Sequence, residues 1–279
     1  MRARLLFAAA ALVALAVAAI VVFLAWFALP VLGTGALGAV LDWEWLPQQG
    51  RFGILPMLVG SLCLALSALL LAFPLGVGLC CFAHGIGPAR LAAPLLTVLR
   101  FMTSVPTVVY GLAALFLLVP LIRDASHGAG FSWLAAALTL ALLILPTIVL
   151  MLEHAFREAK ARIDLSAAAL GFTPAQQVLR LTLPLARRGL GMAAVLGFGR
   201  AIGDTLIPLM LAGNAAQLPG SPLDPLRTLT AHIALVLSTD SQSAAYNSLF
   251  VCGLLLFLIS VLVNLGLRHL RRLREAPHV

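Results

Sequence analysis

The chain has 279 residues, of which 62% are hydrophobic and only 10% are charged, and its formal net charge is +8. Soluble domains carry about a quarter of their residues as charged side chains, so this composition indicates a membrane protein with several spanning helices. At about 20 residues a span plus loops, the length accommodates six such helices and no sizeable soluble domain. No aromatic residues interleave with a basic patch, so the basic residues are expected to report membrane topology rather than a nucleic-acid partner.

Residue types and spacings exclude several kinds of site. The four cysteines, Cys63, Cys80, Cys81 and Cys252, lie in apolar runs without metal-ligand spacing and are expected to be small core residues. The single lysine, Lys160, follows alanine, so the chain lacks a GxxxxGK(S/T) nucleotide loop. The six histidines form no HExxH motif, and no GxSxG elbow occurs. We therefore expect no metal, no cofactor and no catalytic residue, and an intramembrane enzyme is the weak hypothesis.

Six apolar runs predict an all-α bundle of six transmembrane helices that forms one domain, 1–279. The first run follows Arg2 and Arg4 and is longer than a signal-peptide core, so we expect it to be retained. One long, charged, helix-compatible segment, 153–188, separates the fourth run from the fifth. The predicted spans are 5–29, 53–83, 91–121, 131–152, 189–212 and 245–267.

The distribution of lysine and arginine predicts the orientation. The side of the membrane that holds both termini and the segment 153–188 carries most of them, whereas the loops on the other side have only Arg51, Arg123 and Arg227. Positively charged loops stay in the cytoplasm. Both termini and the segment 153–188 are therefore expected to be cytoplasmic.

Four of the six predicted spans contain proline, among them the third at Pro106 and the fifth at Pro208. Each such proline frees a backbone carbonyl one turn earlier, which lipid cannot satisfy but a polar cavity or a neighbouring helix can. Proline is common in membrane helices, yet four spans of this kind favour a bundle that moves.

The third predicted span carries a polar stripe. Arg100, Thr103, Ser104, Thr107 and Tyr110 recur at steps of three and four, which places them on one face of a continuous helix. That face is expected to contact protein or water, and hydroxyls bonded to neighbouring helices would give the same pattern. Arg100 favours a cavity lining, although its side chain could also extend towards the cytoplasm.

The fifth predicted span contains two charged side chains four residues apart. Arg200 lies roughly 16 Å into a helix counted from Gly189, near the middle of a hydrocarbon core about 30 Å thick, where a charge costs about 3 kcal/mol or more. Asp204 is expected on the same face, where it can pair with Arg200, and Gly199 and Gly203 would let another backbone approach. A functional site is favoured over a buried ion pair that only fixes the helix register.

The segment 153–188 contains a candidate docking helix. The run from Asp164 to Leu170 predicts a short alanine-rich helix that stops at Gly171, and Thr173 with Pro174 predicts the cap and first residue of the next helix. A small apolar face of this kind suits insertion into a partner's groove. An amphipathic helix lying on the membrane surface is the alternative interpretation.

This segment resembles the EAA signature of ABC-importer permeases, E-A-A-x3-G-x9-I-x-L-P. The matching residues are Leu165, Ser166, Ala167, Gly171, Leu181, Leu183 and Pro184. Leu165 stands where the family has glutamate, and Asp164 lies one position earlier. The residues that the resemblance assigns to ATPase coupling are Asp164, Leu165, Ser166, Ala167, Gly171, Phe172 and Pro184.

Three further segments narrow the resemblance. They are FGILPMLVGSL at 52–62, SVPTVVYGL at 104–112, and GFGRAIGDT at 197–205 followed by GN at 213–214. Together they are similar to the phosphate-uptake (Pst-type) permeases, and more to the PstC subunit than to PstA, in order and topology over about residues 40–267. That family usually has glutamate where Asp204 stands, so the carboxylate here is one methylene shorter.

The resemblance implies a type I ABC-importer permease fold in the bacterial cytoplasmic (inner) membrane. It implies a subunit that moves inorganic phosphate into the cytoplasm by alternating access, while a partner hydrolyses ATP. The implied partners are a dimer of ATP-binding subunits, a second PstA-like permease and an extracytoplasmic phosphate-binding protein. On this interpretation Arg200 contacts the oxyanion and Asp204 neutralises the arginine between transport events. The other residues expected along the substrate path are Thr103, Ser104, Thr107, Tyr110 and Arg100.

Three alternatives stay open. The same machinery could import another oxyanion, such as molybdate, tungstate or sulfate. A secondary transporter driven by an ion gradient would have no use for the docking segment, and a membrane scaffold would need no path. The residues alone indicate a channel-lining membrane subunit with a cytoplasmic docking loop, and the substrate comes from the resemblance.

Overall fold

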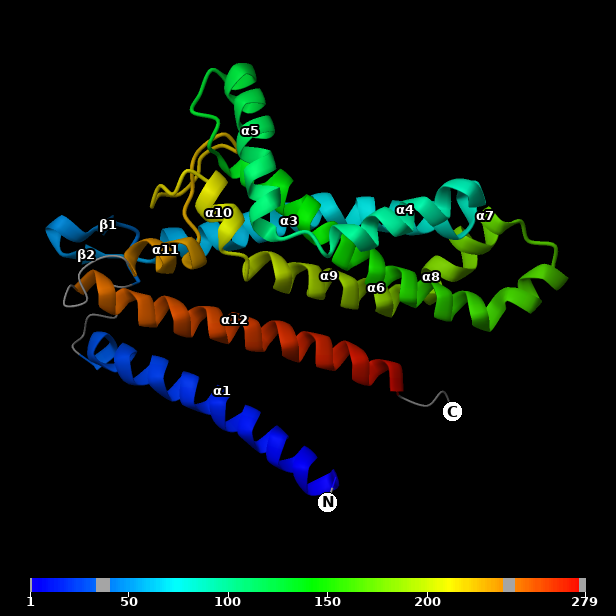
Figure 1. Cartoon of the computed structure of the whole chain (residues 1–279), viewed down its shortest axis with the longest axis horizontal. Helices are drawn as coiled ribbons and strands as arrows, with labels where there is room; N and C mark the ends of the chain where they lie inside the picture. Colours follow the sequence, from blue (N-terminus) through cyan, green and yellow to red (C-terminus); the bar gives the residue numbers. More distant parts are fainter. Residues whose placement is uncertain (1, 34–40, 238–243, 276–279) are drawn as a thin grey trace.

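The described residues form a bundle of helices (Figure 1). The computed structural model describes residues 2–33, 41–237 and 244–275. Four long helices run side by side along the main axis: α3 (Leu55–Cys81), α6 (Trp133–Ala169), α9 (Arg187–Ile202) and α12 (Ala244–Glu275). Helix α1 (Arg2–Gly33) packs against α12. The predicted all-α class is confirmed.

Shorter elements connect and cover these helices. The two-residue strands β1 (Trp45–Leu46) and β2 (Arg51–Phe52) pair as an antiparallel hairpin, in which Trp45 lies opposite Phe52. A 3₁₀ turn (Pro47–Gln49) lies within the hairpin, and π-helical turns occur at Phe82–Ile86 and Gln177–Thr182. The remaining elements are α4 (Ala89–Met102), α5 (Thr107–Ser126), α7 (Pro174–Gln176), α8 (Leu183–Leu185), α10 (Leu206–Leu211) and α11 (Leu229–Val236).

The core lies between α3, α6 and α9, which approach one another at small residues. An added Cβ at Gly76 would lie 2.9 Å from Ile148 Cγ2, and one at Gly197 would lie 2.8 Å from Ile148 Cδ1. Ile148 itself is fully buried. Helices in membranes associate through close van der Waals packing because lipid offers no hydrophobic driving force between them. The glycines therefore set how closely α3 and α9 lie against α6.

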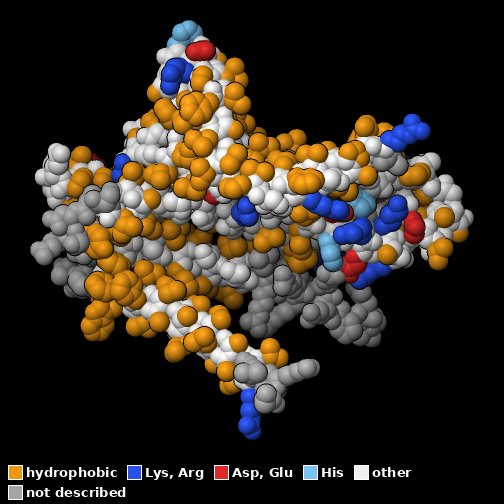
Figure 2. Space-filling view, in the orientation of Figure 1, with side chains coloured by type: hydrophobic (Ala, Val, Ile, Leu, Met, Phe, Trp, Pro, Cys, Tyr) orange, Lys and Arg blue, Asp and Glu red, His pale blue; other side chains and the backbone are white. Residues whose placement is uncertain are grey.

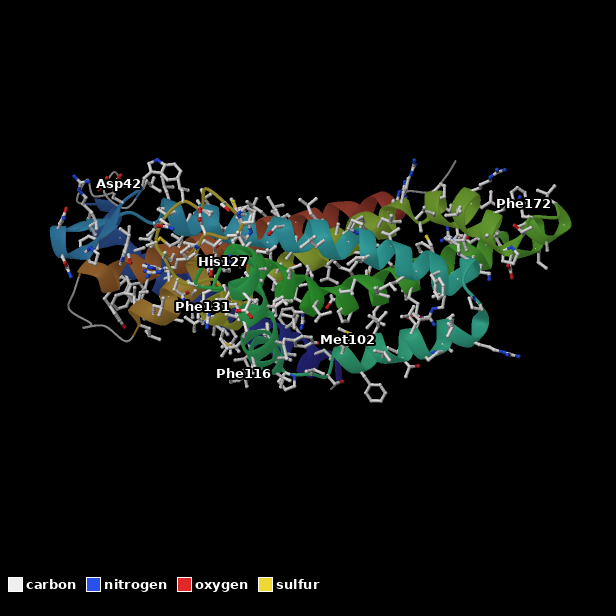
Figure 3. The ribbon with its side chains drawn as sticks, turned by 90° about the horizontal axis from the view of Figure 1, so that it is seen from above. Asp42, Met102, Phe116, His127, Phe131 and Phe172 are labelled. Carbon is white, nitrogen blue, oxygen red and sulfur yellow. The ribbon has the colours of Figure 1, made fainter. Side chains whose placement is uncertain are left out.

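Helix α5 departs from the direction of the other long helices. It rises away from the bundle in one view and is seen almost end-on in the view from above (Figures 1 and 3). Its contacts are mainly with α6 and α10. Phe116, Leu117 and Leu121 on its outer side are 73%, 74% and 65% exposed within the single chain. This helix therefore presents a large apolar face to lipid or to another subunit.

The number of predicted spans is only partly matched. Among the described residues, five helices are long and apolar enough to cross a membrane: Leu6–Leu29, Leu55–Ile86, Thr107–Ser126, Trp133–Ala169 and Ser248–Gly266. The predicted fifth span, 189–212, is missing from this set because it is divided between α9 and α10. The sixth crossing and the orientation of the termini stay predictions.

The predicted continuous helix 91–121 was wrong. Helix α4 ends at Met102 and α5 begins at Thr107, with an extended backbone at Pro106 (φ −58°, ψ 141°). A proline lacks the N–H that a helix needs and disfavours helical geometry at the preceding residue, here Val105. The polar stripe therefore bends, with Arg100 on α4, Thr103 and Ser104 in the link, and Thr107 and Tyr110 on α5.

The predicted continuous helix 189–212 was also wrong. Helix α9 ends at Ile202, and α10 starts at Leu206 after Gly203 and Asp204. The Asp204 carboxylate (Oδ2) accepts a hydrogen bond of 2.9 Å from the Ile207 backbone N–H. Aspartate in this position satisfies an amide at a helix start and thereby favours a new helix over a continued one. Arg200 and Asp204 are consequently not successive turns of one helix.

A buried histidine joins the elements at the hairpin end of the bundle. His232 on α11 is fully buried, its Nε2 lies 3.4 Å from Ser248 Oγ on α12, and its ring meets that of Trp45 edge-on at 4.3 Å. Burial lowers the pKa of His232 to about 3, so the ring is neutral at physiological pH. The hairpin, α11 and α12 are thus held around one uncharged polar residue.

Candidate functional site

The two helix breaks lie beside each other. Helix α5 packs on α10 so closely that a Cβ added at Gly111 would lie 2.6 Å from Met210 Sδ. Gly111 begins the second turn of α5, and Met210 lies in α10. The link 103–106 and the link 203–205 therefore belong to one region, which we call the junction. The sequence placed polar residues in both segments, and the fold brings the two segments together.

Side-chain hydroxyls satisfy the carbonyls that the two prolines free. Pro106 cannot donate to the Met102 carbonyl four residues earlier, and that oxygen accepts hydrogen bonds from the Tyr110 hydroxyl at 2.8 Å and from the Val105 N–H at 3.3 Å. Pro208 likewise cannot donate to the Asp204 carbonyl, which accepts a hydrogen bond of 2.8 Å from Thr230 Oγ1. An unpaired carbonyl in an apolar bundle costs several kcal/mol, so these bonds make the breaks affordable. Tyr110 therefore has a structural role in addition to the predicted one.

Arg200 is the cation of the junction. It lies in the last turn of α9, its side chain is exposed, and no hydrogen bond or ion pair engages it among the described residues. It is close enough to Tyr110 and Asp204 to interact with both electrostatically. The direct Arg200–Asp204 ion pair anticipated from the sequence is not formed, and the Asp204 carboxylate instead accepts the hydrogen bond from the Ile207 N–H in the first turn of α10. The guanidinium donors are left available for a ligand.

The remaining predicted path residues divide by location. Ser104 is exposed in the link, Thr107 is half-buried at the start of α5, and the Thr103 hydroxyl donates to the Arg100 carbonyl at 2.7 Å. The Arg100 side chain turns elsewhere, to Glu153 on α6. Among the predicted path residues of α4, α5 and their link, Tyr110 therefore interacts electrostatically with Arg200, whereas the Arg100 side chain is engaged by Glu153.

Glu153 is a buried carboxylate that the sequence did not reveal. Its Oε1 accepts a hydrogen bond of 2.8 Å from Arg100 Nη2 and lies 3.9 Å from Arg157 Nε, and its side chain is only 6% exposed. The spacing of Glu153 and Arg157 was a visible signal for a helical pair. The partner on α4 lies 53 residues earlier and could not be inferred without the fold. This ion pair ties the helix that leads into the junction to α6.

The segment 153–188, which we call the docking segment, contains the end of α6 rather than a separate docking helix. Helix α6 runs from the membrane core through Asp164 to Ala169, so no new helix starts at Asp164. Gly171 then adopts a left-handed conformation (φ +72°), with bonds from Phe172 N to the Ala167 carbonyl and from Gly171 N to the Ala168 carbonyl. This is a Schellman motif, which explains the predicted stop at Gly171.

The second half of the docking segment follows the prediction. Thr173 and Gln176 form a reciprocal capping box at the start of α7, and Pro174 is its first residue. The Asp164 carboxylate accepts a hydrogen bond of 2.9 Å from Gln177 Nε2 and so ties α6 to the following turn. In Figure 3, Phe172 lies at the end of the bundle opposite Asp42.

The exposed face of the docking segment differs from the expected one. Ala167 is 1% exposed and packs inward, whereas Leu165 and Leu170 are 90% and 74% exposed. The small-residue face that includes Ala167 therefore packs within the chain, and two leucines are presented outward. Ser166 and Pro184 are also exposed, and Phe172 is partly buried.

The docking segment contacts the end of α3 directly. The π-helical turn after α3 has Gly85 so close to α7 that an added Cβ would lie 2.5 Å from the Pro174 carbonyl oxygen. The same turn contacts α4, which leads to the junction. This turn therefore connects α7 to α4, and a displacement of α7 would act on α4 through it.

The family model described as binding-protein-dependent transport system inner membrane component matches residues 76–275. The chain belongs to this family. It is therefore a permease component of an ABC importer and a multi-pass protein of the bacterial inner membrane. The membrane permease of such an importer is not itself an enzyme.

Relatives and solved structures agree with this assignment. The permease is 35% identical over 237 residues to the probable ABC transporter permease protein YqgH of Bacillus subtilis (strain 168), covering 84% of this chain and 77% of that protein. It is 28% identical over 240 residues to the phosphate transport system permease protein PstC of Pasteurella multocida (strain Pm70), covering 79% and 75%. A chain of the inward-facing MetNI methionine ABC transporter superposes with a TM-score of 0.60 at 20% identity, covering 78% of this chain and 95% of that one. The predicted type I importer fold is confirmed.

The buried Glu153 allows a prediction about stability. Replacing Glu153 by Gln removes the carboxylate that pairs with Arg100 and Arg157. A hydrogen bond to a charged group contributes about 1.5–3 kcal/mol to the free energy of unfolding. We expect Glu153→Gln to lower the thermal unfolding temperature of the detergent-solubilised permease by several degrees. Glu44→Gln is the control, since its ion pair with Arg51 is half exposed and worth below about 1 kcal/mol. Equal unfolding temperatures for the two variants would contradict a structural role of Glu153.

Proposed function

We propose that this permease is the PstC-like transmembrane subunit of an ATP-driven importer, and that it moves inorganic phosphate through the junction by alternating access. The observation that carries the proposal is Arg200, an unpaired guanidinium beside two helix breaks in an otherwise apolar bundle. The printed names of several relatives, phosphate transport system permease protein PstC, support the choice of substrate.

The chemistry of the junction suits an oxyanion. A guanidinium stays charged at any physiological pH and presents a planar fork of donors that fits two phosphate oxygens. In this proposal the hydroxyls of Ser104 in the link and of Thr107 at the start of α5 would donate further hydrogen bonds to the anion. Asp204 places a negative charge close to the same cation without bonding it, so it weakens anion binding. A path must bind its ion loosely enough to release it, and a nearby carboxylate serves that end.

The docking segment provides the connection to ATP hydrolysis in this proposal. Leu165 and Leu170 would insert into a groove of an ATP-binding subunit, and the segment would pass the motion of that subunit to α3 and α4 through Gly85. The other proposed partners are a second, PstA-like permease and an extracytoplasmic phosphate-binding protein. The apolar outer face of α5 is suited to the second permease.

Arg200→Ala tests the substrate contact. Loss of a charge-assisted bidentate contact of about 1.5–3 kcal/mol corresponds to at least roughly a tenfold fall in affinity. We expect phosphate uptake by cells carrying the complete transporter to fall at least tenfold at limiting phosphate, with partial activity in Arg200→Lys. Arg123→Ala, on the exposed end of α5, is the control at matched membrane levels.

Uptake that is unchanged in Arg200→Ala would refute the contact. If molybdate, tungstate or sulfate competes better than phosphate in the wild type, the permease instead serves that oxyanion. Uptake by this chain alone in liposomes under an ion gradient would support a secondary transporter.

Leu165→Asp tests the docking segment. Leu165 is 90% exposed, so a carboxylate there should leave the fold intact and oppose insertion into an apolar groove. We expect at least tenfold less ATP-binding subunit to copurify with Leu165→Asp, and phosphate-stimulated ATP hydrolysis to fall in proportion. Ala161→Asp, an exposed position earlier on α6, is the control. A fully coupled Leu165→Asp complex would show that docking occurs elsewhere.

A further inference from the structure

A groove of about 600 Å³ opens between the outer part of α6 and the α8–α9 corner. Its lining includes the close approach of α6 and α9, where a Cβ added at Gly189 would lie 2.3 Å from Ala155 Cβ. It is separate from the junction, since Arg200 lies at the opposite end of α9 from Arg187.

The groove is strongly basic. Four arginines line it, and the single carboxylate on its wall, Glu158, forms an ion pair with one of them at 2.9 Å, from Oε1 to Arg162 Nη2. The other three, Arg180, Arg187 and Arg188, have no ion-pair partner in the part of the chain that the structure describes. On the face shown in Figure 2, most lysine and arginine side chains gather over this end of the bundle. Three arginines without an ion-pair partner around one groove favour the binding of an anionic ligand.

Apart from His154, the rest of the lining is apolar. Met151, Ala155 and Met192 form the inner end, and Leu181 and Leu185 border the outer part. Inorganic phosphate has no apolar surface, so contact with these side chains would not strengthen its binding. An occupant that joins a phosphate group to a hydrocarbon chain matches both parts of the lining.

The position of the groove fits the level of lipid headgroups. Arg187 and Arg188 begin α9, and apolar residues predicted to lie within the membrane follow from Gly189. The N-cap of α9, Ala186, provides no side-chain hydrogen bond to the first turn. A phosphate at this helix start also benefits from the helix dipole. Anionic lipids are concentrated in the cytoplasmic leaflet, where the positive residues of this segment are expected.

We infer that the groove between α6 and the α8–α9 corner binds the phosphodiester headgroup of an anionic phospholipid through Arg180, Arg187 and Arg188. The acyl chains lie along Met151 and Met192. The bound lipid holds the base of α9 against α6, and α9 carries Arg200 at its far end. Transport by the permease therefore depends on anionic lipid, whichever oxyanion it moves.

Phosphatidylglycerol binding to the full-length permease tests this inference. The complex with its ATP-binding and permease partners is delipidated in detergent and titrated with phosphatidylglycerol, phosphatidylcholine or inorganic phosphate, and retained lipid is counted by native mass spectrometry. We expect one tightly retained phosphatidylglycerol per copy of this chain and a higher unfolding temperature, neither of which phosphatidylcholine or inorganic phosphate reproduces. Each arginine near a membrane surface contributes about fivefold in affinity. The triple variant Arg180→Gln/Arg187→Gln/Arg188→Gln should therefore bind roughly a hundredfold more weakly.

The control is the triple variant Arg4→Gln/Arg90→Gln/Arg123→Gln, which removes the same number of exposed charges elsewhere. Equal losses in both triple variants would show a general charge effect and overturn the inference. An unchanged affinity in the groove variant, or an equal response to inorganic phosphate, would overturn it as well. If the groove variant does not accumulate, the wild-type complex still decides, because failure to retain phosphatidylglycerol over phosphatidylcholine contradicts a lipid site and favours a groove covered by a protein partner.

Discussion

Every backbone carbonyl inside a lipid-embedded bundle needs a hydrogen bond, and this constraint organises the permease. Pro106 and Pro208 each remove one helical donor. The Tyr110 hydroxyl, with the Val105 N–H, bonds the Met102 carbonyl, and the Thr230 hydroxyl bonds the Asp204 carbonyl, both hydroxyls at 2.8 Å. With those carbonyls satisfied, α4 and α5 can meet at an angle, and α9 can end before α10 begins. The two links, their polar backbone groups and Arg200 therefore lie together in the junction.

Two long helices connect that place to the opposite end of the bundle. Helix α6 carries Glu153 beside Arg100 and continues without interruption to the Schellman turn at Gly171. Helix α9 begins at the basic groove and ends beside the junction. Rigid helices with ends in two sites move as units. In the proposed transporter, force applied at Leu165 and lipid bound at the groove would both act on the geometry around Arg200.

Much of this architecture could be predicted from the sequence. The stop at Gly171 and the cap at Thr173 are local signals that correspond to observed helix ends, and the apolar runs 5–29, 53–83, 131–152 and 245–267 each correspond to one long observed helix. The helix breaks were misjudged because a stripe with steps of three and four fits a continuous helix as well as a bent one. Asp204 was expected to pair with Arg200 for the same reason, whereas its carboxylate bonds the Ile207 N–H in the first turn of α10.

Other features depend on contacts between distant segments. The Arg100–Glu153 ion pair joins residues that are 53 positions apart, and the packing of Gly111 on Met210 brings the two links together. Neither contact produces a periodic pattern in the sequence from which it could be predicted. Ala167 looked available for docking because alanine is compatible with both a buried and an exposed face, and only the fold decided between them.

The central claim is that the junction is a water-accessible path for an oxyanion, and cysteine accessibility in the assembled transporter tests it most directly. Single cysteines would replace Ser104, Gly203 or Leu117 after the four native cysteines are changed to alanine. A membrane-impermeant thiol reagent should modify Ser104→Cys and Gly203→Cys, phosphate should slow both reactions, and Leu117→Cys on the apolar face of α5 should stay unmodified. Equal rates at all three positions, or modification that phosphate does not slow, would contradict the account.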